Sequence, residues 1–183
     1  DAIDYQNQEG ETALFKAIIH GHLECVKHII SEGGSMKIAL PGDVNVLHVA
    51  ADYGHLDILE YLLDYDEAVT RNLINSLTAG DRRGFGPIHF AVANKHENCV
   101  SLLLSKNADI RLRTTCSPHK ASTPLHIAAV RNHVEITKIL LKFDTTIIYE
   151  VNSLGWYPLH AASHHGSRDV ITLLLKEGAD LSG

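Results

Sequence analysis

One stretch of sequence recurs along the whole chain, and this repetition limits the possible fold more than any other feature. Its clearest copy is STPLHIAAVRNHVEITKILLK, residues 122–142. Thr123 is suited to cap a helix and Pro124 to open its first turn, and apolar residues follow with helical spacing. After Asn132 and His133, a second apolar stripe predicts a second short helix. Two such helices bury too little apolar surface to fold alone, so each unit needs neighbouring copies.

The copies align on the position held by His126. The equivalent residues, at spacings of 33, 41, 37 and 34, are Phe15, His48, His89, His126 and His160. Fourteen residues after each anchor begins an aliphatic pair, and these pairs are Ile29-Ile30, Leu62-Leu63, Leu103-Leu104, Leu140-Leu141 and Leu174-Leu175. This register predicts five repeats, at approximately residues 7–39, 40–80, 81–117, 118–151 and 152–183.

A period near 33 residues together with the tetrapeptide Thr-Pro-Leu-His at residues 123–126 resembles the ankyrin repeat family, along almost the whole chain. The resemblance implies an all-α solenoid of stacked helix-turn-helix units, with hairpin-like fingers at right angles to the helices and little strand. Residues 1–183 would then form one array rather than a globular domain. The enlarged connection after copy two and the closing GADLSG are also similar to the cytosolic ankyrin arrays of transient receptor potential channels of the ankyrin (TRPA) type.

Two connections between repeats are longer than the family period requires. About eight extra residues lie between Asp64 and Gly84, where Leu73, Ile74 and Leu77 predict a longer second helix or an added helical turn. About four extra residues fall within residues 111–122 and predict a long finger.

The first and last copies keep apolar residues that a free terminal repeat would replace by polar ones. Copy one carries Ile18 and Ile19, and copy five carries three consecutive leucines at residues 173–175. A terminal repeat needs a polar outer face because no neighbour covers it. We therefore expect this sequence to be an excerpt of a longer array, with neighbouring repeats as its first partners.

Composition and motifs narrow the function classes. The net charge is −6, and basic residues are few and lack a stacking-aromatic motif, so nucleic-acid binding is not expected. No catalytic or phosphate-binding motif occurs, which predicts a protein that is not an enzyme and has no cofactor. No apolar run approaches the roughly 20 residues that span a bilayer, so we expect no direct membrane insertion of this segment.

The cysteines show no disulfide or metal-binding pattern, and this favours a reducing, cytoplasmic location. Cys25 and Cys99 share one repeat position, ten residues after the anchor, and are predicted to lie in the core. Cys116 falls in a predicted loop and is expected to be accessible. Among the histidines, His160, His164 and His165 are close enough in sequence for a zinc site to be conceivable, but most histidines occupy repeat positions, and we predict no metal.

The charge is unevenly distributed along the chain. Residues 1–80 hold 4 Lys and Arg against 13 Asp and Glu, whereas residues 81–183 hold 12 against 9. Positions on the fingers and near the ends of the first helices point away from the solenoid core in such arrays, and copies three to five are rich in arginine and aromatic residues there. The predicted partner-binding residues are Tyr53, Arg82, Arg83, Phe85, Arg111, Arg113, Arg131, Trp156, His164 and His165.

Two functions remain open from the sequence. The first is a non-catalytic module that binds a protein partner, with an acidic and partly hydrophobic segment, in the concave groove and on the fingers. The second is a structural or coupling segment of a long ankyrin array in a larger assembly, such as the cytosolic part of a TRPA-type channel. Fold alone does not choose between them.

Overall fold

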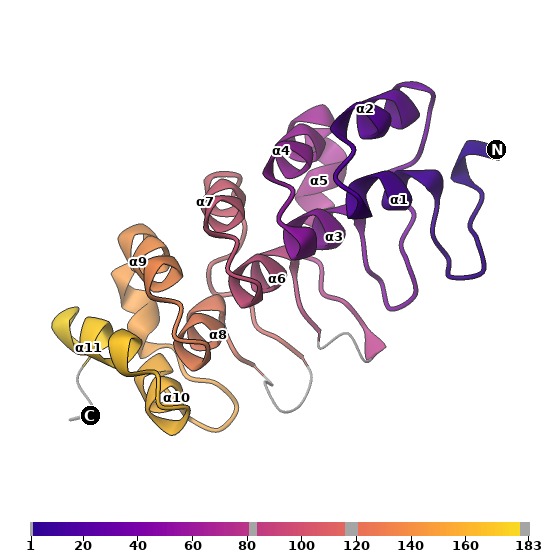
Figure 1. Ribbon diagram of the computed structural model, residues 1–183. Helices are drawn as coiled ribbons and strands as arrows, with labels where there is room; N and C mark the ends of the chain where they lie inside the picture. The colour runs from indigo at the N-terminus through magenta and orange to yellow at the C-terminus, as the bar shows by residue number, and fades with distance from the viewer. Residues whose placement is uncertain (1, 81–83, 116–120, 180–183) are drawn as a thin grey trace.

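The computed structural model describes residues 2–80, 84–115 and 121–179. Within them, helices stack in a single row that runs from one terminus to the other (Figure 1). Each repeat supplies an inner and an outer helix, and the five pairs are α1 (Ala13–Ile19) with α2 (Leu23–Ser31), α3 (Val46–Tyr53) with α4 (Leu56–Tyr65), α6 (Pro87–Ala93) with α7 (Glu97–Ser105), α8 (Pro124–Val130) with α9 (Val134–Phe143), and α10 (Pro158–His164) with α11 (Arg168–Lys176). The predicted all-α solenoid is confirmed, and the described residues show a single isolated β-bridge, Leu40 with Val44.

The inner helices begin where the sequence places a cap or a proline. The Asn45 side chain accepts hydrogen bonds from the backbone amides of Leu47 and His48, at 2.9 and 3.1 Å. Pro87 and Pro124 are the first residues of α6 and α8, where a missing amide proton costs no helical hydrogen bond. These residues fix where each repeat starts.

The bend between the two helices of each repeat needs a left-handed backbone. The residue six positions after each anchor has positive φ in all five repeats, and these residues are Gly21, Gly54, Lys95, Asn132 and Gly166. Glycine adopts this conformation at little cost. Gly54 is also sterically required, because a Cβ there would lie 2.4 Å from the ring of His96.

The core runs the length of the stack between inner and outer helices. The repeat position ten residues after the anchor is buried at Ile58, Cys99 and Ile136, with 0 to 1% exposure. The prediction of a buried Cys25 is wrong, since its side chain is exposed. In the described residues no outer helix precedes α2 that could cover this side chain.

The enlarged connection after repeat two forms a separate helix, α5 (Glu67–Leu73). It begins earlier than Leu73, Ile74 and Leu77 suggested. Asp66 ends α4 in an extended conformation, and its carboxylate accepts a hydrogen bond from the Val69 amide at 3.1 Å, which caps α5. The described residues also include the 3-10 helices η1 (Ala2–Asp4) and η3 (Thr145–Tyr149). The long finger within residues 111–122 is described only at its base, where Thr114 pairs with Ser122 and Ala121.

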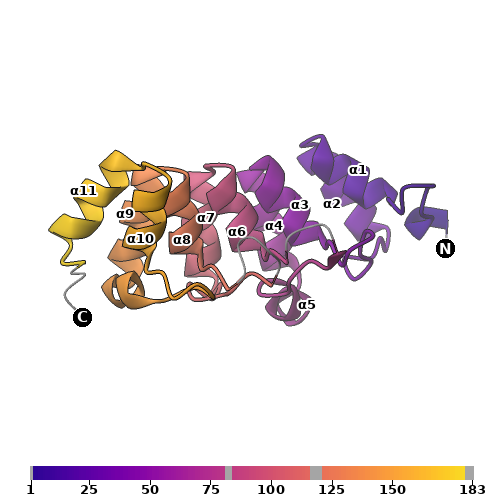
Figure 2. The ribbon, with the colours of Figure 1, turned by 90° about the horizontal axis from the view of Figure 1, so that it is seen from below.

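The stack has two distinct sides. The fingers project beside α1, α3, α6, α8 and α10, and we call this side the inner surface (Figure 1). Helices α2, α4, α7, α9 and α11 form the opposite, outer surface. Seen from below, α5 lies beside α4, away from the row of helix pairs (Figure 2). A partner could therefore approach either side.

Candidate functional site

An aromatic and imidazole cluster marks the inner surface of the last repeat. The ring of Trp156, from the finger before α10, lies 5.0 Å from the ring of His164 at the end of that helix. His164 in turn lies 4.9 Å from His165, edge to face. Both histidines are exposed and Trp156 is partly exposed. The structure thus brings together three predicted residues as one surface that a partner side chain could cover.

Two further predicted residues occupy the equivalent ends of other inner helices. Tyr53, the last residue of α3, is 51% exposed and stacks on His55 with the rings 6.0 Å apart. Arg131 follows the end of α8 and is exposed. Because successive inner helices lie side by side, these residues and the Trp156 cluster belong to one side of the stack, although they are spread over repeats two, four and five.

Arg111 and Arg113, by contrast, are ion-paired with residues of the array itself. Arg111 bonds to Asp144 at 2.7 Å and to Glu150 at 3.0 Å. Arg113 shares Glu150 and also donates to the Ala121 carbonyl at 3.1 Å. Hydrogen bonding to Asp144 raises the pKa of Arg111. Both guanidiniums thus already tie the long finger to the segment between repeats four and five, and their contact with an acidic partner stays a prediction.

Phe85, another predicted contact residue, is buried in this structure. Its side chain is 3% exposed and packs against His89 and Phe90, with ring centroids 5.4 and 5.5 Å away. An apolar ring at the base of a finger is better covered by the next inner helix than left to solvent. Arg82 and Arg83 lie outside the described residues, and so does Cys116.

The motif histidines have a structural role at the junctions between repeats. In repeat four, Nδ1 of His126 accepts from the Thr123 amide at 3.3 Å, while Nε2 donates to the Trp156 carbonyl of the next finger at 2.8 Å. His48 and His89 make the same two bonds in their repeats. Burial lowers the pKa of each of these three imidazoles to about 4.

The bend histidines connect the repeats in the opposite direction. His55 and His96 donate through Nε2 to carbonyls of the preceding inner helix, at 3.2 and 2.9 Å. In the part of the chain that the structure describes, no three His, Cys, Asp or Glu side chains gather as a metal site would require. The motif and bend histidines named above therefore link repeats, and His164 and His165 belong to the inner surface.

Sequence reasoning missed the bonds of Arg111 and Arg113 to Glu150. The signal that could have found them is the repeat itself, because residues about one period apart lie side by side. Arg113 and Glu150 are 37 residues apart and opposite in charge. Such a pair in two consecutive connections predicts an ion pair between fingers rather than a free arginine.

Comparisons with known proteins agree with this architecture. The family model for ankyrin repeats (three copies) matches residues 1–73, 43–114 and 111–182. The chain is 29% identical over 181 residues to palmitoyltransferase AKR1 of Lachancea kluyveri, which covers 97% of this chain and 23% of that protein. It is 26% identical over 189 residues to transient receptor potential cation channel subfamily A member 1 of Drosophila melanogaster, covering 100% of this chain and 16% of the channel. The nuclear factor NF-kappa-B p105 subunit of Gallus gallus is 27% identical over 178 residues, with 97% and 17% covered.

The chain spans less than a quarter of the length of each of these relatives. Within residues 2–80, 84–115 and 121–179, no helix is long and apolar enough to cross a bilayer. Ankyrin repeats generally mediate protein–protein interaction and are typically non-catalytic. With its paired helices, its histidine links between repeats and family matches that together cover residues 1–182, the chain belongs to the ankyrin-repeat family.

Proposed function

We propose that this chain is a cytoplasmic, non-catalytic module that binds a segment of a partner protein on its inner surface. The observation that carries the proposal is the cluster of Trp156, His164 and His165, in which three adjoining rings remain exposed or partly exposed. Tryptophan is enriched among the residues that dominate interface energetics. A partner side chain placed on these rings would be removed from water without any rearrangement of the array.

The partner segment we propose is acidic and partly hydrophobic. Arg131 is exposed on the repeat next to the Trp156 cluster and can form a forked hydrogen bond with a carboxylate. Arg82 and Arg83 are retained in this proposal on sequence grounds. Arg111 and Arg113 are left out because Asp144 and Glu150 engage them. Fewer arginines than the sequence suggested would therefore contact the partner.

The test compares two aromatic residues on opposite sides of the array, the partly exposed Trp156 and the exposed Phe143. In affinity capture, the parent chain and the Phe143→Ala variant should retain the same partner. Phe143 is 56% exposed but lies at the end of outer helix α9, away from the inner surface. Trp156→Ala should lose that partner, mainly through faster dissociation measured by surface binding kinetics. Retention of the partner by Trp156→Ala, or equal loss with Phe143→Ala, would refute the site.

A second candidate function is a coupling segment within a long ankyrin array of a larger assembly. The similarity to the TRPA channel of Drosophila melanogaster favours it, since it extends over the whole of this chain. Repeat arrays transmit strain through contacts between neighbouring repeats, and the links made by His126, Arg111 and Arg113 are contacts of this kind. The full-length sequence distinguishes the two, because a channel-like membrane region after the array would support coupling.

A further inference from the structure

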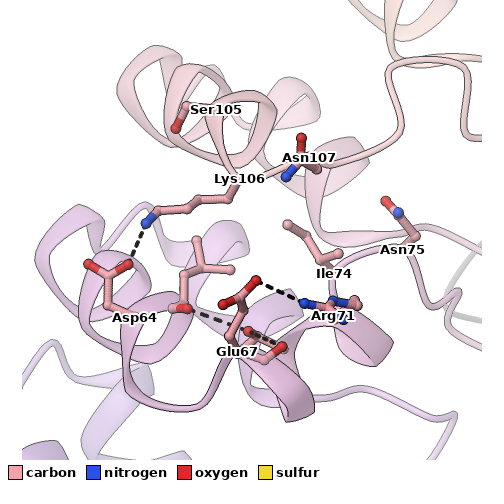
Figure 3. Close-up of a pocket in the computed structure, with 10 residues that line it drawn as sticks. Asp64, Glu67, Arg71, Ile74, Asn75, Ser105, Lys106 and Asn107 are labelled. Carbon is pink, nitrogen blue, oxygen red and sulfur yellow. Dashed lines mark hydrogen bonds and ion pairs between the residues drawn. The ribbon is translucent and has the colours of Figure 1, made fainter.

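A cavity of about 490 Å³ opens on the outer surface, where helices α4 and α5 meet the end of α7 (Figure 3). Its base includes Leu63, Thr70 and Ile74, each at most 5% exposed. Its rim is polar and includes Asp64, Glu67, Arg71, Ser105, Lys106 and Asn107. The cavity depends on α5, the helix that the enlarged connection adds to repeat two. It is therefore a feature of this array and not of a regular repeat.

Two carboxylates and two cations line this rim, and Glu60 adds a third carboxylate on the adjoining exposed face of α4. Lys106 of repeat three reaches across to bond with Asp64 of repeat two (Figure 3). That bond is the largest cause of the raised pKa of Lys106, and the carboxylates of Glu60 and Glu67 also raise it electrostatically. Arg71 pairs with Glu67 at 2.9 Å. With Glu60 included, three carboxylates lie near these two cations, in a half of the chain where acidic residues exceed basic ones by 13 to 4.

The adjoining face of α4 adds two tyrosines. Tyr61 and Tyr65 have ring centroids 5.7 Å apart, and Tyr65 is 51% exposed. The ammonium of Lys27, from α2, already lies 6.0 Å from the centroid of the Tyr61 ring. A cation near an aromatic face is attracted by the ring quadrupole. Lys27 and Lys106 therefore show, within the molecule, how this surface accommodates a positive group.

We propose that this cavity and the exposed face of α4 form a second docking surface, and that its occupant is a basic segment of a partner protein. The surface, which we call the outer cavity, consists of Glu60, Tyr61, Leu63, Asp64, Tyr65, Glu67 and Ile74. An aliphatic side chain of the segment covers Leu63 and Ile74. Its Lys or Arg groups bond to the exposed Glu60, share the exposed carboxylates of Asp64 and Glu67 with Lys106 and Arg71, and lie against Tyr65. Charge complementarity also speeds encounter. This proposal does not depend on the inner-surface site, which lies on the opposite side and favours an acidic partner.

The experiment uses the 183-residue chain and a fluorescein-labelled peptide of Arg, Leu and Gly as the probe. Fluorescence anisotropy at two salt concentrations should show binding that weakens as salt rises. A peptide with Glu in place of Arg should not bind. Equal binding of both peptides would overturn the proposed partner chemistry.

Charge-matched variants separate a specific site from general attraction to an acidic protein. The double variant Glu60→Gln/Glu67→Gln should weaken binding about fivefold, as expected for the loss of two exposed ion pairs. Glu32→Gln/Glu177→Gln changes the net charge equally at exposed positions elsewhere and should leave affinity nearly unchanged. Equal weakening in both double variants would show that binding is non-specific and would overturn the proposal.

A second pair of variants tests the cavity without changing charge. Ser105 is exposed and lines the cavity, so Ser105→Trp should obstruct it and weaken binding of the Arg peptide. Ser101 lies one turn earlier on α7 and is also exposed, but it does not line this cavity, so Ser101→Trp should bind as the parent does. Circular dichroism confirms that each variant is folded. A folded Ser105→Trp protein with parental affinity would exclude the cavity as the binding site.

Discussion

Lowering the pH from 7.5 to 5 should destabilise the array through three buried histidines. His48, His89 and His126 have folded-state pKa values of about 4, because burial penalises the charged imidazole. In the unfolded chain a histidine has a pKa of about 6.5. Between these values the unfolded state binds protons that the folded state does not. The stability contributed by the neutral imidazoles is therefore complete above pH 6.5 and is lost as the pH falls toward 4.

The size of the effect follows from these pKa values. At pH 5 each unfolded-state histidine is largely protonated and each folded-state one is not, which costs about 2 kcal/mol per residue. Three such residues give a loss of about 6 kcal/mol, comparable to the whole stability of many domains. The paired carboxylates affect stability only in a lower pH range. Glu11, for example, has its pKa held at about 2 by its hydrogen bond with Lys16, so its contribution is lost only below the ordinary value of 4.5.

The assay is urea unfolding of the chain at several pH values from 7.5 to 5, followed by circular dichroism. Removing one titrating group by His126→Ala should lower stability at pH 7.5 and reduce the dependence on pH by about a third. His28→Ala replaces an exposed histidine of α2 and should leave the pH dependence as in the parent. A parent chain with the same free energy of unfolding at pH 5 and 7.5 would refute the reasoning, because it would mean that these imidazoles are not buried and neutral.

Two further perturbations test the junctions between repeats. Gly54→Ala should lower the free energy of unfolding by about 1–3 kcal/mol, because it combines a positive φ with a Cβ that would overlap the His96 ring. Gly80→Ala, also at positive φ but with open space around it, should lower it by about 1 kcal/mol or less. Equal denaturant midpoints for the two variants would contradict this packing. Glu150→Gln should lower the free energy of unfolding by about 1–2 kcal/mol, because one partly buried carboxylate serves both Arg111 and Arg113. Glu67→Gln breaks an ion pair in which both side chains are exposed, and it should lower the free energy of unfolding by about 0.5 kcal/mol or less. Thermal unfolding of the two variants compares these effects directly.

The fold could be predicted from sequence because residues within each repeat mark where its helices begin and end. The anchors His48, His89 and His126, the helix-initiating prolines and the aliphatic pairs recur in register, and in an array only neighbouring repeats touch. Local pattern therefore determines most of the packing. The helix α5 was anticipated in kind but not in position, since Asp66 acts at once as the end of α4 and the cap of α5.

The candidate site was harder to predict because exposure depends on what lies across from a residue in the next repeat. The sequence marks Arg113 and Phe85 as suitable interface residues, but Glu150 pairs with the first and Phe90 covers the second. Trp156, His164 and His165 could be grouped from sequence because the finger and the end of the following helix are fixed by one repeat. The outer cavity could not be predicted, because it forms where α5, a helix outside the repeat pattern, meets the end of α7 in the next repeat.

The proposed inner-surface site and the acid-sensitive links share one hydrogen bond. Nε2 of His126 donates to the carbonyl of Trp156, and this bond positions the finger that carries the indole. Protonation places a second N–H on Nδ1, which then faces the Thr123 amide that it formerly accepted from. The Thr123 amide then loses its acceptor, whereas Nε2 still donates to the Trp156 carbonyl as long as the ring keeps its place. The Trp156 backbone loses its support when the charged ring turns away toward water. The geometry that would present Trp156 to a partner is therefore the same geometry that requires His126 to be neutral, so the two properties depend on one buried imidazole.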